Sequence, residues 1–374
     1  MIDDGFPTIS SVDQDAVESA VYEALKDIDD VKLWRSEHIS FLETGLRKLP
    51  KSFQSLDASR PWLVFWISQA LDVLGAFDEN KLDIASFLAL CQNVSGGFGG
   101  GPMQLPHLAT TYAAVCGIII SGDYSVVDRQ SLYCFIKSLK SDSGGFRMHQ
   151  NGETDMRGTY CAMAVGSLLG ILTDELTDGV TEYILSCQTF EGGFAGDSGG
   201  LEAHGGYSYC GLAALGILRS KLGTEFFIDK KDRFQKLLWW VCQRQMTFEG
   251  GFNGRANKLV DSCYSFWQGA SLVILRDIFE FCGWQVPNEP GNMYWFSRAG
   301  LETYVLGACQ NCNGGCKDKP GKNADYYHTC YSLSGLAVTL EEEQDAHGIL
   351  RTDALYNLRP SRIDSLKNWL ASHT

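Results

Sequence analysis

The sequence predicts an all-α fold, an α/α barrel (toroid) of tandem helical hairpins. Two observations carry this prediction: a phrase ending in Gly-Gly recurs along the 374 residues, and the segments between its copies lack the polar-apolar alternation of strands. A period near fifty residues is typical of one supersecondary unit copied in tandem. The first glycines of the five copies lie 48, 48, 58 and 64 residues apart, at Gly96, Gly144, Gly192, Gly250 and Gly314.

Most copies of the phrase begin with Cys-Gln and end with Gly-Gly-Phe, as at residues 187–194. We read Cys242-Gln243 as the start of the fourth copy, and Gly144-Gly145-Phe146 as a degenerate copy. Glycine adopts the positive φ that helix ends require. The Gly-Gly pairs are therefore predicted to be the turns of the helical hairpins.

Each unit is predicted to pair an inner, apolar helix with an outer, amphipathic one. Residues 112–118 and 160–166 are compact and rich in Ala and Gly, whereas 232–242 and 366–372 are amphipathic. Such units can stack as an open solenoid or close into a barrel, and the small inner residues favour closure. No low-complexity linker interrupts the repeats, so we expect one domain: a helical lead-in over residues 1–55 and the barrel over 56–374.

Bulk properties narrow the function classes. The formal net charge of −14 argues against a nucleic-acid binder, which normally presents a basic face. The longest apolar stretch, around residues 113–120, is far shorter than the about eighteen residues that span a bilayer. Because the chain starts with neither a basic nor an apolar segment, we predict no signal peptide. We expect a cytoplasmic protein whose thirteen cysteines are reduced.

Residues 250–270 hold the densest run of functional residue types. Asp261 and Cys263 are two positions apart, which inside a regular helix would direct them to nearly opposite sides. At a helix start, Asp261 is a good N-cap and Cys263 lies in the first turn, so both can face one metal ion. With one distant histidine they would leave a fourth position open, as in catalytic zinc sites. A capping aspartate beside a buried cysteine is the simpler interpretation of these residues alone.

Two further segments place charged groups near glycine turns. Arg255, Lys258 and His204 offer groups that charge-assisted hydrogen bonds would join to a diphosphate. Two solvated cations and a core histidine explain the same residues more simply. Asp318 is a candidate Mg²⁺ contact, hard oxygen to hard cation, or a member of an ordinary charged loop.

A cysteine cluster suggests a different metal site. Cys309, Cys312 and Cys316 have the tight spacing of a structural zinc site, with His328 as a fourth ligand. Cys309 also occupies the usual cysteine position of the repeat. That coincidence favours a structural role for at least one member of the cluster.

Several phrases resemble those of protein prenyltransferase β subunits, and the match runs nearly end to end. It begins around residues 6–8 and continues through 57–62, 96–108 and 155–161. The most specific pieces are Glu-Ala-His-Gly-Gly-Tyr at 202–207, Asn-Lys-Leu-Val-Asp-Ser-Cys-Tyr-Ser-Phe-Trp at 257–267, and residues 318–331 with Asp-Lys-Pro-Gly-Lys and Asp-Tyr-Tyr-His-Thr-Cys-Tyr. Three such phrases in order outweigh the simpler interpretations given above.

The resemblance implies a set of site residues. One zinc ion would be held by Asp261, Cys263 and His328, with Mg²⁺ near Asp318. The diphosphate would be bound by His204, Arg255, Lys258 and Tyr264, together with a lysine from a separate α subunit. The isoprenoid cavity would be lined by Trp62, Trp66, Arg157, Tyr160, Tyr207, Cys210, Trp267, Tyr327 and Tyr331. Arg157 is also expected to reach the tail of a peptide substrate.

The activity implied by the resemblance is transfer of farnesyl from farnesyl diphosphate to the cysteine thiol of C-terminal Cys-a-a-X proteins, in a heterodimer with the α subunit. Zinc would lower the pKa of the substrate thiol and present it as a thiolate. Cations at His204, Arg255 and Lys258 and a hydrogen bond from Tyr264 would stabilise charge on the departing diphosphate.

The choice of isoprenoid rests on three positions in the resemblance. Bulky Trp62, with Tyr331 beside it, shortens the cavity, and Asp318 stands where the geranylgeranyl type I branch has lysine. We therefore expect farnesyl. The alternatives are a geranylgeranyltransferase type I β subunit and a non-enzymatic repeat scaffold. A terpene cyclase is less favoured, because its Asp-x-Asp-Asp motif is matched only at residues 27–30, ahead of the repeats.

Overall fold

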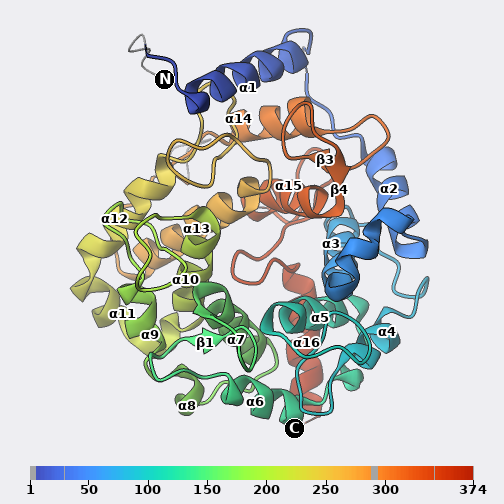
Figure 1. The fold of residues 1–374 in the computed structure, drawn as a ribbon, viewed down its shortest axis with the longest axis vertical. Helices are drawn as coiled ribbons and strands as arrows, with labels where there is room; N and C mark the ends of the chain where they lie inside the picture. Colours follow the sequence, from blue (N-terminus) through green and yellow to red (C-terminus); the bar gives the residue numbers. More distant parts are fainter. Residues whose placement is uncertain (1–5, 29, 288–293, 341, 374) are drawn as a thin grey trace.

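The computed structural model describes residues 6–28, 30–287, 294–340 and 342–373, and it confirms the predicted α/α barrel (Figure 1). Its inner layer is a closed ring in which each helix packs on the next and the last packs on the first. In chain order the inner helices are α3 (Arg60–Val73), α5 (Leu108–Ser121), α7 (Met156–Leu168), α10 (Gly205–Ile217), α13 (Tyr264–Phe281) and α15 (Tyr326–Val338).

A second layer of helices surrounds this ring. The outer helices are α2 (Arg35–Arg47), α4 (Ile84–Cys91), α6 (Arg129–Ser138), α9 (Val180–Ser186), α12 (Lys231–Cys242) and α14 (Arg298–Glu302), which continues as the π-helical segment η3 (Thr303–Cys309). The short elements α8 (Asp174–Thr177), α11 (Arg219–Asp229), η1 (Lys51–Ser59) and η2 (Tyr124–Val126) lie in the connections. The inner helices are buried nearly all round, whereas α6 and α12 bury one face, as their sequences predict.

The Gly-Gly turns lie where the sequence predicts them, and the first glycine of every pair has a positive φ between 82° and 108°. In the first and third repeats the glutamine before the turn joins its repeat to the next outer helix, whereas in the second repeat Lys140 has that position and donates to the carbonyls of Leu176 and Asp178. Gln92 donates to the carbonyl of Asp128, the N-cap of α6, and Gln188 donates to the carbonyl of Arg233 in α12. In the fourth repeat this role belongs to Gln245 and not to the predicted Gln243, because two residues separate the end of α12 at Cys242 from Gln245, which bridges to Phe252 and donates to the Ser297 carbonyl.

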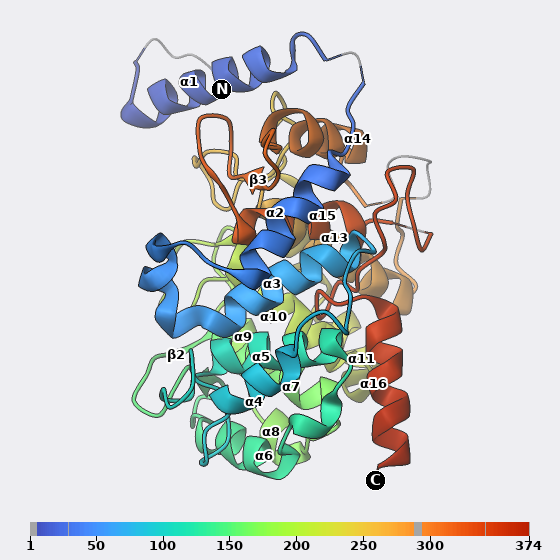
Figure 2. The same cartoon turned by 90° about the vertical axis from the view of Figure 1, so that its right-hand side faces the viewer.

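The last turn closes the ring onto the start of the chain. The Gln310 side chain donates to the carbonyl of Lys32, just before α2, and accepts from the Trp34 amide. A Cβ on Gly314 would lie 2.1 Å from the carbonyl oxygen of Glu37 in α2, so only glycine fits there. Helix α2 is thus the outer helix next to the last repeat. Helix α1 (Ile9–Leu25) lies outside the barrel and packs on η3 (Figure 2).

All six inner helices run in the same direction, so their N-termini gather at one end of the barrel, which we call the mouth. Two small antiparallel hairpins lie there: β1 (Phe146–Arg147) with β2 (Thr154–Asp155), and β3 (Cys316–Lys317) with β4 (Ala324–Asp325). The aligned peptide dipoles give a helix N-terminus a partial positive charge. The mouth therefore favours anionic groups.

The opposite end is closed by the last part of the chain. The loop of residues 353–358 lies within the ring in Figure 1, and α16 (Pro360–Ser372) packs against α5 and α7. Arg362 fixes α16 to α3 by a 2.8 Å ion pair with the buried carboxylate of Asp72. Among the described residues, none of the helices is both long and apolar enough to cross a bilayer.

Candidate metal and substrate site

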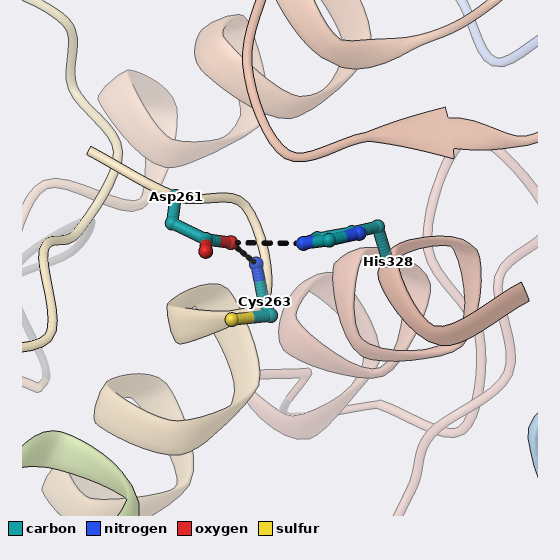
Figure 3. Close-up of side chains that lie close together, drawn as sticks. All are labelled: Asp261, Cys263 and His328. Atoms are coloured by element: carbon teal, nitrogen blue, oxygen red, sulfur yellow. Dashed lines mark hydrogen bonds and ion pairs between the residues drawn. The ribbon is translucent and has the colours of Figure 1, made fainter. Parts of the chain in front are cut away.

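Three side chains predicted as metal ligands meet at the mouth. Asp261 and Cys263 lie in the turn before α13, where the Asp261 carboxylate accepts a 2.9 Å hydrogen bond from the Cys263 amide. His328 comes from the first turn of α15, the neighbouring inner helix. The ligand atoms of the three residues all lie within 4.8 Å of one another (Figure 3). The turn geometry thus brings Asp261 and Cys263 to one side despite their spacing.

A fourth side chain orients the histidine. Asp325 caps α15 by accepting from the His328 amide at 2.7 Å, and its other oxygen lies 2.6 Å from His328 Nδ1. The second ring nitrogen, Nε2, lies 3.3 Å from the Asp261 carboxylate. With Nδ1 bonded to Asp325, Nε2 is the nitrogen free to bind a metal, the arrangement that commonly fixes metal-binding histidines. Asp325 was not among the predicted site residues, although its N-cap position is visible in the sequence.

The electrostatics of these residues suit a bound cation. Burial and the Asp261 carboxylate raise the pKa of the Cys263 thiol well above its ordinary value. Burial lowers the pKa of His328, but its bonds to Asp261 and Asp325 outweigh this and raise it to about 9. Burial would raise the pKa of Asp261, yet the bond to His328 holds it below the usual value. Without a cation the cluster retains protons, which a divalent ion would displace. One sulfur, one nitrogen and one oxygen ligand fit zinc with an open position.

Asp318 lies beside this cluster but is already paired. Its carboxylate makes a short ion pair with Lys319. Burial and the charge of Asp261 raise the pKa of Asp318. Its backbone carbonyl accepts from the Ser262 amide at 2.9 Å and so braces the Asp261–Cys263 turn. The structure therefore gives Asp318 a definite bracing role, while its carboxylate would reach a Mg²⁺ ion only by exchanging Lys319.

The predicted diphosphate groups are arranged around the start of α10. His204 caps α10 through Nδ1, which accepts from the Gly206 amide at 3.0 Å, and its Nε2 lies 3.0 Å from the Tyr264 hydroxyl. Arg255 is half-buried and pairs with Glu202 at 2.8 Å, whereas Lys258 is exposed. Burial and the charge of Arg255 lower the pKa of His204. At neutral pH His204 is therefore a neutral hydrogen-bond donor and not the fixed cation that the sequence argument expects.

Aromatic side chains form a closed circle inside the barrel. Neighbouring ring centroids lie 4.4–5.8 Å apart, and the circle passes through every inner helix in turn. Its members are Trp62, Tyr112, Tyr160, Tyr209, Trp267, Tyr331, Tyr327 and Trp66. Because it visits all the inner helices, it lines the barrel interior. Four members, both α3 tryptophans with Trp267 and Tyr327, stay partly exposed, so solvent reaches this interior.

Two members of the aromatic circle, Tyr112 and Tyr209, were missed in the sequence. Each follows a hydroxyl residue that bonds the Gly-Gly turn of its own repeat: Thr111 and Ser208 accept from the amides of Phe98 and Phe194. Thr159 plays the same part before Tyr160. Alignment of these Thr/Ser-Tyr pairs would have identified all three tyrosines.

The remaining predicted lining residues lie nearer the mouth or in the core. Arg157, in the first turn of α7, pairs with Asp155 and lies 3.1 Å from Glu153. Its guanidinium carbon is 5.9 Å from the centre of the half-buried Tyr207 ring. Cys210 is buried beside Tyr209. Arg157 is about half exposed, at 48%, and so remains accessible to a ligand at the mouth.

Neither competing motif forms a second site. His328 joins Asp261 and Cys263, and that trio is the one group among the described residues that could hold a metal ion, so Cys309, Cys312 and Cys316 form no such cluster with it. Cys309 and Cys316 are buried, and Cys312 is exposed. In the segment 27–30, Asp29 lies outside the described residues, and Asp27 and Asp30 are exposed outside the barrel.

Comparison with known proteins identifies the family and the fold. The model of the prenyltransferase alpha-alpha toroid domain matches residues 33–358. The protein farnesyltransferase subunit beta of Arabidopsis thaliana is 39% identical, over 88% of this chain and 80% of that protein. The geranylgeranyl transferase type-1 subunit beta of the same plant is 33% identical, over 83% of this chain and 85% of that protein. The solved Candida albicans protein geranylgeranyltransferase-I, complexed with GGPP, shares the fold with a TM-score of 0.75 at 21% identity, over 91% of this chain and 99% of that one.

Proposed function

The chain belongs to the prenyltransferase alpha-alpha toroid family, and on that premise we propose that it is the catalytic β subunit of a protein farnesyltransferase. In this proposal it transfers farnesyl from farnesyl diphosphate to the cysteine thiol of C-terminal Cys-a-a-X proteins. The observation that carries the proposal is the meeting of Asp261, Cys263 and His328 at the mouth. A barrel that served only as a scaffold would have no need of three convergent ligands.

A zinc ion bound by these residues would hold the substrate thiol as a thiolate at neutral pH. The chain's own residues prepare that site. Asp325 keeps Nε2 of His328 directed at Asp261, and the Cys263 amide holds the Asp261 carboxylate in place. The partly buried setting strengthens the electrostatic attraction between these ligands and a cation.

The leaving diphosphate would be received at the start of α10 and α13. Tyr264 and His204 present hydrogen-bond donors there, and Arg255 and Lys258 supply positive charge. The N-terminus of α10 adds the partial charge of its dipole. Fixed donors at the point where charge develops favour departure of the diphosphate. Mg²⁺ near Asp318 belongs to the proposal, and it would have to replace the Lys319 contact.

The aromatic circle would bind the isoprenoid chain. Trp62, Trp267 and Tyr327 are partly exposed members of this circle and offer apolar surface, and the Tyr327 ring centre lies 5.0 Å from that of His328. Aromatic faces also tolerate partial positive charge at the reacting carbon. Farnesyl is proposed over geranylgeranyl because bulky Trp62 and Tyr331 narrow this interior.

Partners and location belong to the proposal as well. The relatives are named as beta subunits, so we propose a heterodimer with an α subunit that completes the diphosphate site. A cytoplasmic location fits a substrate with a free C-terminal cysteine motif.

The test is a competition assay on the heterodimer, co-expressed with a cognate α subunit. Equal farnesyl and geranylgeranyl diphosphates are offered with a Cys-a-a-Met peptide, and the products are separated by mass. We expect farnesyl peptide to dominate. A dominant geranylgeranyl product would make the chain a type I β subunit, and the absence of any prenyl peptide would contradict prenyl transfer altogether.

A further inference from the structure

Three buried tyrosines meet below the mouth, at the closed end of the barrel interior. Tyr112, Tyr160 and Tyr209 come from the consecutive inner helices α5, α7 and α10 and are at most 4% exposed. The Tyr160 hydroxyl lies 3.3 Å from that of Tyr112 and 3.2 Å from that of Tyr209. Burial raises the pKa of all three phenols well above the ordinary value, so they stay protonated and able to donate.

The three hydroxyls bind three successive carbonyls of one loop. Tyr112 donates to the carbonyl of Tyr356 at 2.8 Å, Tyr160 to that of Leu355 at 2.8 Å, and Tyr209 to that of Ala354 at 3.0 Å. A carbonyl buried without a partner would be costly, so these bonds fix the position of the loop. Three donors on three successive inner helices match three successive acceptors in reverse sequence order.

The loop is otherwise held by only a few polar contacts. Asp353 accepts from the amides of Leu355 and Tyr356 at 2.8 and 3.1 Å, and this shapes the turn. The Tyr356 hydroxyl lies 2.9 Å from Ser167 of α7, and Gln69 of α3 donates to Asn357 at 3.3 Å. Residues 353–358 form no helix or strand. Two backbone bonds close the loop on itself, from the Asp353 amide to the Leu358 carbonyl at 2.7 Å and from the Asn357 amide to the Asp353 carbonyl at 3.0 Å, so the bonds that tie it to the inner helices come from side chains.

The same tyrosine rings belong to the aromatic circle that lines the barrel. Their faces therefore form the wall while their hydroxyls hold the loop beneath it. A side chain on Gly216 of α10 would collide with Leu355, since its Cβ would lie 2.7 Å from a Leu355 methyl carbon. The loop thus packs tightly against the inner helices and closes the interior from below.

We propose that Tyr112, Tyr160 and Tyr209 are positioning residues that hold loop 353–358 as the floor of the isoprenoid site, and that this floor limits the length of the isoprenoid. The inference rests on the proposed function. A longer isoprenoid must displace the floor, and it can do so only by breaking the hydroxyl-carbonyl bonds. Both the bulky Trp62 side chain in the wall and the hydrogen-bonded loop 353–358 would then limit the length of the isoprenoid.

Tyr209→Phe tests this, because it removes one hydroxyl and keeps the ring. The heterodimer is titrated with farnesyl and with geranylgeranyl diphosphate, and binding is measured directly. We expect the ratio of geranylgeranyl to farnesyl affinity to rise about tenfold. Hydrogen exchange should also become faster at the Leu355 and Tyr356 amides. Tyr183→Phe is the matched control, since Tyr183 of α9 is also buried, at 4% exposed, and donates to the Thr154 carbonyl away from the loop.

An unchanged affinity ratio in Tyr209→Phe would overturn the proposal, as would a change of the same size in Tyr183→Phe. Should Tyr209→Phe not fold, Leu355→Ala shortens the floor without touching the hydroxyls. It should raise the same ratio, and an unchanged ratio there would also overturn the proposal. Because binding is measured without turnover, an enzyme that binds farnesyl diphosphate yet transfers nothing would contradict the proposed function alone.

Discussion

Two repeats of the barrel have the same local structure and different chemistry. The β1–β2 hairpin pairs Phe146 with Asp155 before α7, and the β3–β4 hairpin pairs Cys316 with Asp325 before α15. In both, the aspartate caps the inner helix. A threonine four residues later donates to the carbonyl of that aspartate, at Thr159 and at Thr329.

The two repeats differ at the third residue after the aspartate. In α7 that residue is Gly158, whose Cβ would lie 2.5 Å from the Phe146 carbonyl oxygen, so no side chain fits. In α15 it is His328, whose ring reaches Asp261 in the neighbouring repeat. Asp155 instead pairs with Arg157. The two repeats share one scaffold, and a histidine in place of glycine, next to Asp261, supplies the candidate metal ligand.

The largest expected effect is at the residue that distinguishes the two repeats. His328→Ala should lose metal binding and reduce transfer by more than about a hundredfold, because it removes a ligand and not only its support. Metal content and single-turnover transfer check this on the same heterodimer preparation. Full activity in His328→Ala would remove His328 from the site.

The equivalent aspartates provide a matched pair. Asparagine caps helices nearly as well as aspartate, so Asp325→Asn and Asp155→Asn should both fold. Asp325→Asn should weaken zinc binding by about 10–100-fold, because His328 loses its carboxylate partner. Asp155→Asn should leave zinc affinity unchanged. Competition with a metallochromic chelator measures both, and equal zinc affinities in the two variants would contradict the role of Asp325.

Because the pKa of His328 is raised, the stability of the metal-free protein and its affinity for zinc should change with pH in opposite directions. In the chelated protein, its pKa of about 9 exceeds the value of about 6.5 in the unfolded chain. The resulting stability is fully present below pH 6.5 and is lost as the pH rises through about 9, at most about 3 kcal/mol. Zinc affinity should instead increase over that range, because binding displaces the proton. Urea unfolding and zinc titration from pH 6 to 9.5 check both trends, and His328→Gln should abolish the loss of stability.

The smallest expected effect is on the free energy of unfolding, and it should be equal in the two repeats. Thr159→Val and Thr329→Val each remove a buried hydroxyl that accepts from the amide of Phe146 or Cys316. Each should lower the free energy of unfolding by about 1–3 kcal/mol. Denaturant unfolding with zinc bound measures the difference. A much larger loss in Thr329→Val would show that the β3–β4 hairpin depends on more than the shared scaffold.

The sequence predicted the barrel because its turns need glycine, and glycine pairs at a regular spacing are visible without a structure. It did not predict that α2 completes the ring, since the bond from Gln310 to Lys32 joins the two ends of the chain. It also did not predict that Gln245 takes the place of Gln243, because two additional residues lie between the end of α12 and the bridge to Phe252.

The sequence predicted some features of the site and not others, because the rest depend on contacts between distant parts of the chain. Asp261, Cys263 and His328 were identified through the resemblance, and the structure brings them together. The neutral state of His204 was not predicted, because it follows from burial. Loop 353–358 has no regular structure and no repeat, so nothing in its residues indicates that three tyrosines hold it.

The most direct test of the account replaces the metal with cobalt(II) in the heterodimer and measures absorption from sulfur-to-cobalt charge transfer. One cysteine ligand, Cys263, predicts a band of single-thiolate intensity. Addition of a Cys-a-a-Met peptide should raise that intensity as the substrate thiolate joins the metal in its open position. A spectrum without a thiolate band, or one that the peptide leaves unchanged, would contradict the central claim that Asp261, Cys263 and His328 hold a catalytic metal.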